Sequence, residues 1–103
     1  MLKQLTKYDY REQFCAALRS GKYHRAIGLA KLKSKTLSTR RIKACAIQVG
    51  MYEGLWEHRG RTPSWPSYTE ATDKLGICAI DIAILNDEGW SFRQIADWIE
   101  AQP

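Results

Sequence analysis

Apolar positions along the chain recur mostly at the three- and four-residue spacing of an amphipathic α-helix. The first such series is Tyr10, Phe14, Ala17 and Leu18. Asp9 and Glu12 have the spacing of a capping box at the start of this series, and Gly21 can supply a left-handed helix end after it. The pattern therefore predicts a helix over about residues 9–20.

A second helical series occupies the middle of the chain. Its apolar positions are Ile42, Cys45, Ala46, Val49 and Tyr52. Ser38 or Thr39 can cap this helix at its start, and Gly54 can end it. We expect one side of it to be buried.

Residues 54–67 form the longest predicted loop, because prolines deny the segment regular hydrogen bonding. Trp56 and Trp65 favour a loop that is pinned on the core over one that is free in solvent. The loop does not indicate a linker or a second domain.

Two further helices are predicted between residues 67 and 89. Ser67 and Glu70 have the spacing of a second capping box, which opens a short helix to Leu75 that Gly76 ends. The next apolar series is Ile77, Ile80, Ile84 and Leu85. Gly89 can end the helix that this series predicts.

The segment from Leu85 to Glu100, LNDEGWSFRQIADWIE, carries a complete helix start. Ser91 can cap the helix, Gln94 can complete a capping box, and Trp90 can pack on Ile95 as a hydrophobic staple. A similar run forms the first helix of many helix-turn-helix units, where a second helix reads the bases. Only a few residues follow Glu100, and the helix is acidic. We therefore expect it to pack internally rather than to read DNA.

Residues 22–38 fit neither the helical nor the strand period well, and a short basic β-hairpin is the favoured interpretation. The whole pattern predicts one small, mostly α domain over residues 1–103, with about four helices around one core. The class becomes α+β if the hairpin forms.

Charge is divided unevenly along the chain. Residues 1–61 hold fourteen Lys and Arg against four Asp and Glu, a net charge of +10, whereas residues 62–103 hold two against seven, a net charge of −5. Eight basic residues and no acidic ones lie between residues 22 and 43. Such a segment attracts phosphates or acidic protein surfaces, although a solvated basic face has the same composition. The acidic half could also fold back on the basic half.

Candidate chemistry is sparse. Cys15, Cys45 and Cys78 are widely spaced between apolar neighbours, which favours buried, reduced thiols over disulfides. His24 and His58 are not at metal-ligand spacing from them, so we expect no metal and no cofactor. Asp81 is expected to point outward or to meet a basic residue, and no phosphate-binding loop is present. An enzyme is disfavoured, and a hydrolase or transferase whose site forms only in the fold is the weakest alternative.

Neither a membrane span nor an apolar signal core is evident in the sequence. The expected location is therefore the cytoplasm.

Three blocks of the sequence resemble a group of small uncharacterised proteins of tailed bacteriophages and prophages. The blocks are FCAALRSGKY at residues 14–23, a Cys-containing apolar helix in the middle, and LNDEGWSFRQIAD at residues 85–97. About a quarter of the chain matches closely. ACAI at residues 44–47 stands where that group usually has a Cys pair, and residues 23–32 lack most of its glycines.

The resemblance implies a short accessory protein made in an infected bacterial cell, and it supplies no catalytic residues. Such proteins often occupy a surface of host machinery, including CRISPR-type and other defence complexes. This implies a non-catalytic inhibitor or modulator of a host protein or ribonucleoprotein complex.

We expect a contact surface in which the basic segment combines with exposed aromatic residues, because Arg and aromatic side chains dominate interface hot spots. The residues chosen on this basis are Lys31, Lys33, Lys35, Arg40, Arg41, Lys43, Tyr23, Trp56 and Trp65. The alternative hypothesis is a sequence-tolerant nucleic-acid-binding protein that uses the same basic segment, with Tyr23 or His24 stacking on bases.

Overall fold

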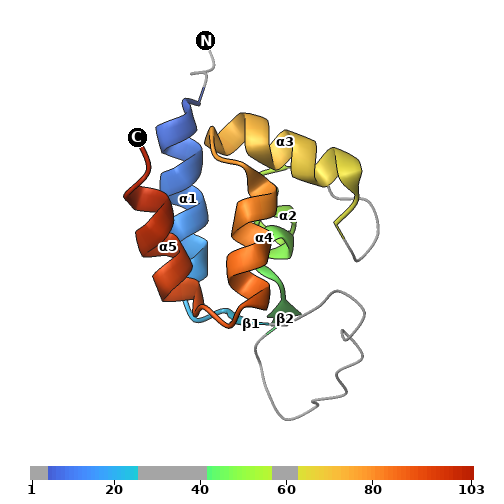
Figure 1. Ribbon diagram of the computed structural model, residues 1–103, viewed down its shortest axis with the longest axis vertical. Helices are drawn as coiled ribbons and strands as arrows, with labels where there is room; N and C mark the ends of the chain where they lie inside the picture. The colour runs from blue at the N-terminus through green and yellow to red at the C-terminus, as the bar shows by residue number, and fades with distance from the viewer. Residues whose placement is uncertain (1–4, 26–41, 57–62) are drawn as a thin grey trace.

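The computed structural model describes residues 5–25, 42–56 and 63–103 (Figure 1). The elements within these ranges are α1 (Lys7–Arg19), β1 (Tyr23–Arg25), β2 (Ile42–Ala44), α2 (Ala46–Tyr52), α3 (Trp65–Leu75), α4 (Ala79–Asp87) and α5 (Phe92–Glu100). The predicted mostly α class is confirmed. The described ranges hold five helices, where about four were expected.

Helix α1 begins earlier than the sequence pattern predicted. Thr6 is the N-cap, and its hydroxyl accepts from the Asp9 amide at 3.2 Å while the Asp9 carboxylate accepts from the Thr6 amide at 2.9 Å. Asp9 therefore occupies the N3 position of the capping box and not the N-cap. Thr6 can take this role because its backbone is extended there.

The strand pairing differs from the predicted hairpin. Residues 23–25 form a strand, but β1 pairs with β2 in parallel, and Tyr23 lies opposite Ile42. The remainder of the predicted hairpin lies outside the described residues. Ile42 therefore belongs to a strand, and the expected helix start at Ser38 or Thr39 is wrong.

Helix α2 begins at Ala46 because the first backbone donors find partners there. The Cys45 amide donates to Gln48 Oε1 at 2.9 Å, and the Ala46 amide donates to Oδ1 of the buried Asn86 on α4 at 3.1 Å. Helix α3 also begins earlier than predicted, with Ser64 as N-cap and a proline in its first turn, where the missing amide costs nothing. Ser67, which was expected to cap, is instead a buried residue inside the helix.

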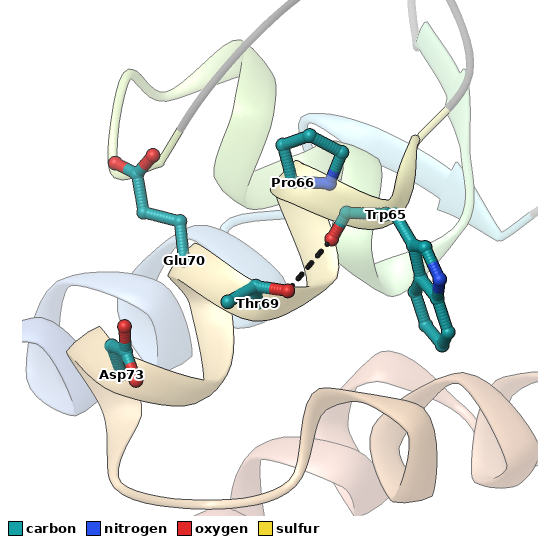
Figure 2. A pocket seen from close by; sticks show the side chains of 5 residues that line it. All are labelled: Trp65, Pro66, Thr69, Glu70 and Asp73. Carbon is teal, nitrogen blue, oxygen red and sulfur yellow. Dashed lines mark hydrogen bonds between the residues drawn. The ribbon is translucent and has the colours of Figure 1, made fainter.

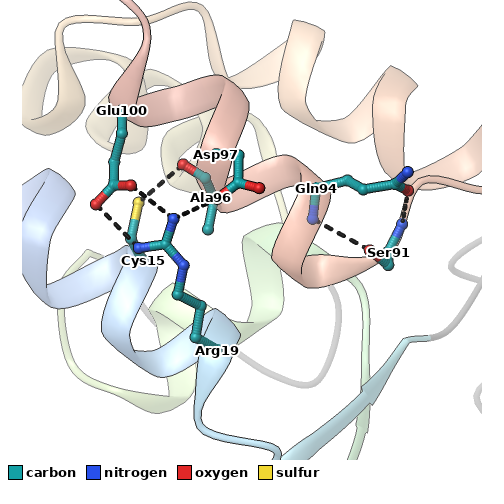
Figure 3. A network of polar contacts seen from close by, with 7 residues as sticks. All are labelled: Cys15, Arg19, Ser91, Gln94, Ala96, Asp97 and Glu100. Atoms are coloured by element: carbon teal, nitrogen blue, oxygen red, sulfur yellow. Dashed lines mark hydrogen bonds and ion pairs between the residues drawn. The ribbon is translucent and has the colours of Figure 1, made fainter.

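The last helix is confirmed as a packing element. The Ser91 amide donates to Gln94 Oε1 at 2.9 Å, and the Gln94 amide donates to Ser91 Oγ at 3.1 Å, which completes the predicted capping box (Figure 3). Ile95 and Ile99 are fully buried. Helices α5 and α1 run side by side in opposite directions (Figure 1).

An exposed ion cluster also joins α5 to α1. The guanidinium of Arg19 donates to Glu100 at 2.9 and 2.6 Å and to Asp97 at 2.6 Å (Figure 3). This pairing raises the pKa of Arg19 and lowers that of Glu100. Acidic side chains of the second half thus do fold back on a basic side chain of the first half, at the end of α1.

No helix in the described part of the chain is both long and apolar enough to cross a membrane.

Candidate protein-binding surface

The basic residues chosen from the sequence are not brought together by the described structure. Five of them lie outside the described residues, namely Lys31, Lys33, Lys35, Arg40 and Arg41. Lys43 lies in β2, in register with His24 of β1.

Trp56 was expected among the exposed aromatic residues, and this expectation is wrong. Its ring is buried and its indole N–H donates to the carbonyl oxygen of Ile47 at 3.0 Å. It meets the ring of Phe14 edge-on, with the ring centroids 4.9 Å apart. A Cβ at Gly50 would overlap the Trp56 ring, so the glycine makes room for it. Trp56 does pin the start of the predicted loop on the core.

Tyr23 is likewise buried rather than exposed. Its ring stacks on Tyr52 with centroids 6.1 Å apart, and its hydroxyl donates to the Glu53 carboxylate, which Lys22 Nζ also meets at 3.3 Å. Burial and the bond to Glu53 raise the pKa of Tyr23, while the same bond lowers the pKa of Glu53. Tyr23 therefore holds β1 against the end of α2.

Of the three aromatic residues selected from the sequence, Trp65 is the one that the structure leaves exposed and accessible to a partner. It is the first residue of α3 and its side chain is 70% exposed. The ring of Tyr68 meets it edge-on at 6.3 Å between centroids, and the Thr69 hydroxyl donates to its carbonyl oxygen at 3.0 Å. Figure 2 shows the indole extending away from the helix. The expectation that Trp65 is pinned on the core is therefore wrong.

Two shallow grooves meet at Trp65. The larger, of about 580 Å³, is lined by Trp65, Pro66, Thr69, Glu70 and Asp73 (Figure 2). The smaller, of about 260 Å³, is lined by Trp65, Tyr68, Thr69, Thr72, Asp73 and Ile80, and so reaches from α3 to α4. Both are open hollows rather than enclosed cavities.

Apolar exposure continues along α4 beyond the smaller groove. Ile80 is 42% exposed, and Ile84, one helical turn further on, is 49% exposed. Sequence reasoning placed both isoleucines in the core series of this helix, so it missed their exposure. We call Trp65, Pro66, Thr69, Glu70, Asp73, Ile80 and Ile84 together the Trp65 surface.

The charged side chains on and beside the Trp65 surface are mostly acidic. Glu70 and Asp73 line the larger groove, and Asp81 is exposed on α4 next to Ile80. Within the described ranges none of these three carboxylates has a basic partner within ion-pair distance. Two alternatives were expected for Asp81: that it points outward, or that it meets a basic residue. The first of them is confirmed. Such a surface attracts cations and repels phosphates.

The three cysteines differ in exposure. Burial, with nearby Glu100 adding to it, raises the pKa of Cys15 to about 11, and burial also raises that of Cys45. Cys78 is exposed, so the expectation of three buried thiols is wrong for it. Among the described residues, no three His, Cys, Asp or Glu side chains are placed to hold a metal ion. His58 lies outside these residues.

A scan against protein-family models found no match to this chain, and searches of curated proteins and of solved structures found none either.

Proposed function

We propose that this protein is a non-catalytic binding protein that attaches through the Trp65 surface to a host protein complex and inhibits or modulates it. The observation that carries the proposal is the 70% exposure of Trp65 at the meeting point of two grooves. Exposed tryptophan is enriched among residues that dominate binding energy in protein interfaces, and an exposed apolar patch marks an interaction site.

The cellular setting of the proposal comes from the resemblance to small phage and prophage proteins. The proposed setting is the cytoplasm of an infected bacterium, where defence complexes, CRISPR-type complexes among them, are the targets that a short inhibitor would occupy. Blocking such a complex needs no catalytic residue, only a stable contact.

The distribution of charge favours a second candidate function, nucleic-acid binding by the basic segment. The described residues contain eight Lys and Arg against ten Asp and Glu, a net charge of −2, and the remaining residues contain eight against one, a net charge of +7. A phosphate backbone would thus be attracted to segments other than the Trp65 surface. The two candidates use different residues, so they can be tested separately.

Site-specific crosslinking tests the proposed function. A photoreactive amino acid replaces Thr69 on the Trp65 surface or, as a control, Gln13 on the exposed side of α1, and each protein is irradiated in bacterial lysate. We expect a host protein to be crosslinked from position 69 and not from position 13. Mass spectrometry identifies it, and the purified host protein should then bind the unmodified chain at least tenfold more tightly than the Trp65→Ala variant.

The same experiment can contradict the proposal. Equal crosslinking from both positions, or wild-type affinity of the Trp65→Ala variant, would show that the Trp65 surface is not the contact. Loss of every crosslink after nuclease treatment would favour the nucleic-acid candidate.

A further inference from the structure

Building on the proposed function, we infer that the Trp65 surface receives a basic amphipathic helix of a partner protein. In this arrangement an apolar side chain of the partner lies against Trp65 and Ile80, and a Lys or Arg side chain meets Asp73 and Glu70.

The apolar half of the inference follows from the row that leads from α3 to α4. Trp65 and Ile80 line one groove although they belong to different helices, and Ile84 continues the row along α4. Open apolar rows of this kind are the receptor side of helix-in-groove recognition, where apolar anchors of the ligand recur every three or four residues. Ile80 and Ile84 are four residues apart on α4, so the row offers more than one apolar contact to a ligand.

The electrostatic half follows from the carboxylates beside that row. Glu70 and Asp73 line the larger groove together with Trp65, and the described structure provides neither of them with a basic partner. A basic side chain of the partner would therefore supply the ion-pair partner that these two carboxylates lack among the described residues. An Arg side chain is especially suited, because it can pair with a carboxylate or stack on the exposed face of Trp65.

Spacing along α3 sets the geometry of the ligand. Trp65 and Asp73 are eight residues apart on a helix, which corresponds to about 12 Å at 1.5 Å per residue. Two helical turns of a ligand span nearly the same distance, so an apolar residue and a basic residue seven or eight positions apart on one face would reach both. A nucleic acid is disfavoured here because its phosphates would meet Glu70, Asp73 and Asp81.

A designed peptide tests the inference directly with the full chain. The probe is a soluble alanine-based helical peptide that carries two leucines and two arginines on one face, with a leucine and an arginine seven residues apart. One control peptide has glutamates in place of the arginines, and another has alanines in place of the leucines. Binding is followed by NMR chemical shifts of ¹⁵N-labelled protein at low and moderate salt.

We expect the arginine and leucine peptide to shift the indole N–H of Trp65 and the amides of residues 65–84. The affinity should fall at least tenfold in the Trp65→Ala variant and at least fivefold in the doubly substituted Glu70→Gln and Asp73→Asn variant, which should also lose most of the salt dependence. The Glu12→Gln variant on α1 removes an exposed carboxylate elsewhere and should bind as the wild type does. Both control peptides should bind at least tenfold more weakly.

Equal binding of the glutamate peptide, shifts confined to other parts of the protein, or no binding at all would overturn the inference. Shifts of residues 65–84 on simple dilution without peptide would overturn it in favour of a second copy of this chain as the occupant. The outcome of the crosslinking experiment is independent of the peptide experiment. If a host protein is crosslinked from position 69 but the peptide does not bind, the proposed function still holds, and only the proposal of a basic helix as the ligand is rejected.

Discussion

The Arg11 guanidinium on α1 donates through Nε to the carbonyl oxygen of Leu75, the last residue of α3, at 2.7 Å. The same guanidinium donates to the carbonyl oxygens of Gln102 at 3.0 Å and Pro103 at 3.1 Å, beyond the end of α5. Arg11 is buried, and its Nε donor satisfies a carbonyl that α3 leaves open at its carboxyl end. One side chain thus joins the ends of two helices to a third.

Arg11→Ala is expected to destabilise the protein by about 2–3 kcal/mol, because hydrogen bonds from a charged donor are lost and the carbonyl of Leu75, whose bond to Arg11 is buried, is left without this donor. Arg11→Lys should recover only part of this loss, since an ammonium cannot match the planar fork of donors. Urea unfolding followed by circular dichroism measures both variants. Equal stability of Arg11→Ala and the wild type would contradict this role.

Two tryptophans should differ sharply in their contribution to the free energy of unfolding. Trp56→Ala removes a buried ring and its hydrogen bond to Ile47, and should cost about 3–5 kcal/mol. Trp65→Ala removes an exposed ring and should change stability by less than about 0.5 kcal/mol. Urea unfolding of the two variants checks the prediction, and a large loss in Trp65→Ala would place that ring in the core.

The contact between Glu53 and Tyr23 predicts a dependence of stability on pH. The pKa of Glu53 is lowered in the folded state, so its contribution is present above its ordinary pKa of 4.5 and is lost as the pH falls through the lower folded value. The pKa of Tyr23 is raised above 10.0, so its contribution is present below pH 10 and is lost as the pH rises through the folded value.

Tyr23→Phe removes the shared hydrogen bond and should flatten both limbs of this profile. Unfolding by urea at several pH values from 3 to 11 gives the comparison with the wild type. A Tyr23→Phe variant whose acid and alkaline losses match those of the wild type would show that the contact does not set the profile.

Thiol reactivity should separate the three cysteines. In the native protein a thiol reagent at pH 8 should modify Cys78 rapidly, because it is exposed. Cys15 and Cys45 are buried with raised pKa values, so they should react only on unfolding. The number of thiols that react should therefore be one in the folded chain and three in denaturant. In a Cys78→Ser variant no thiol should react before unfolding.

The sequence identified the start of α5, because the determinants of that helix start are local. Ser91 and Gln94 are three residues apart, and their capping box depends on little else, so the pattern located α5 correctly. The pairing of β1 with β2 could not be read in this way, because its two strands are nearly twenty residues apart and only three residues long. The role of Arg11 could not be predicted from the sequence either, since every carbonyl that it binds is more than sixty residues away.

The candidate site was predicted only in part for a similar reason. Trp56 and Trp65 looked alike in the sequence, as aromatic residues of one proline-containing loop. Their difference arises because α3 begins at Trp65, which turns that ring outward, whereas Trp56 meets a space that Gly50 leaves open. The exposed isoleucines of α4 were missed because a helix whose apolar residues lie on several faces does not reveal which of them is covered.

The short connection between α3 and α4 has a mechanical consequence for binding. Gly76 turns the chain with a left-handed backbone, the Ala79 amide donates to the Thr72 hydroxyl at 2.9 Å across the corner, and Arg11 clamps the corner from α1. These contacts hold α3 and α4 at their relative angle in the unbound protein. A ligand of the Trp65 surface meets helices whose backbone is already ordered, so the entropic penalty of association falls on the ligand and on the exposed side chains of the surface.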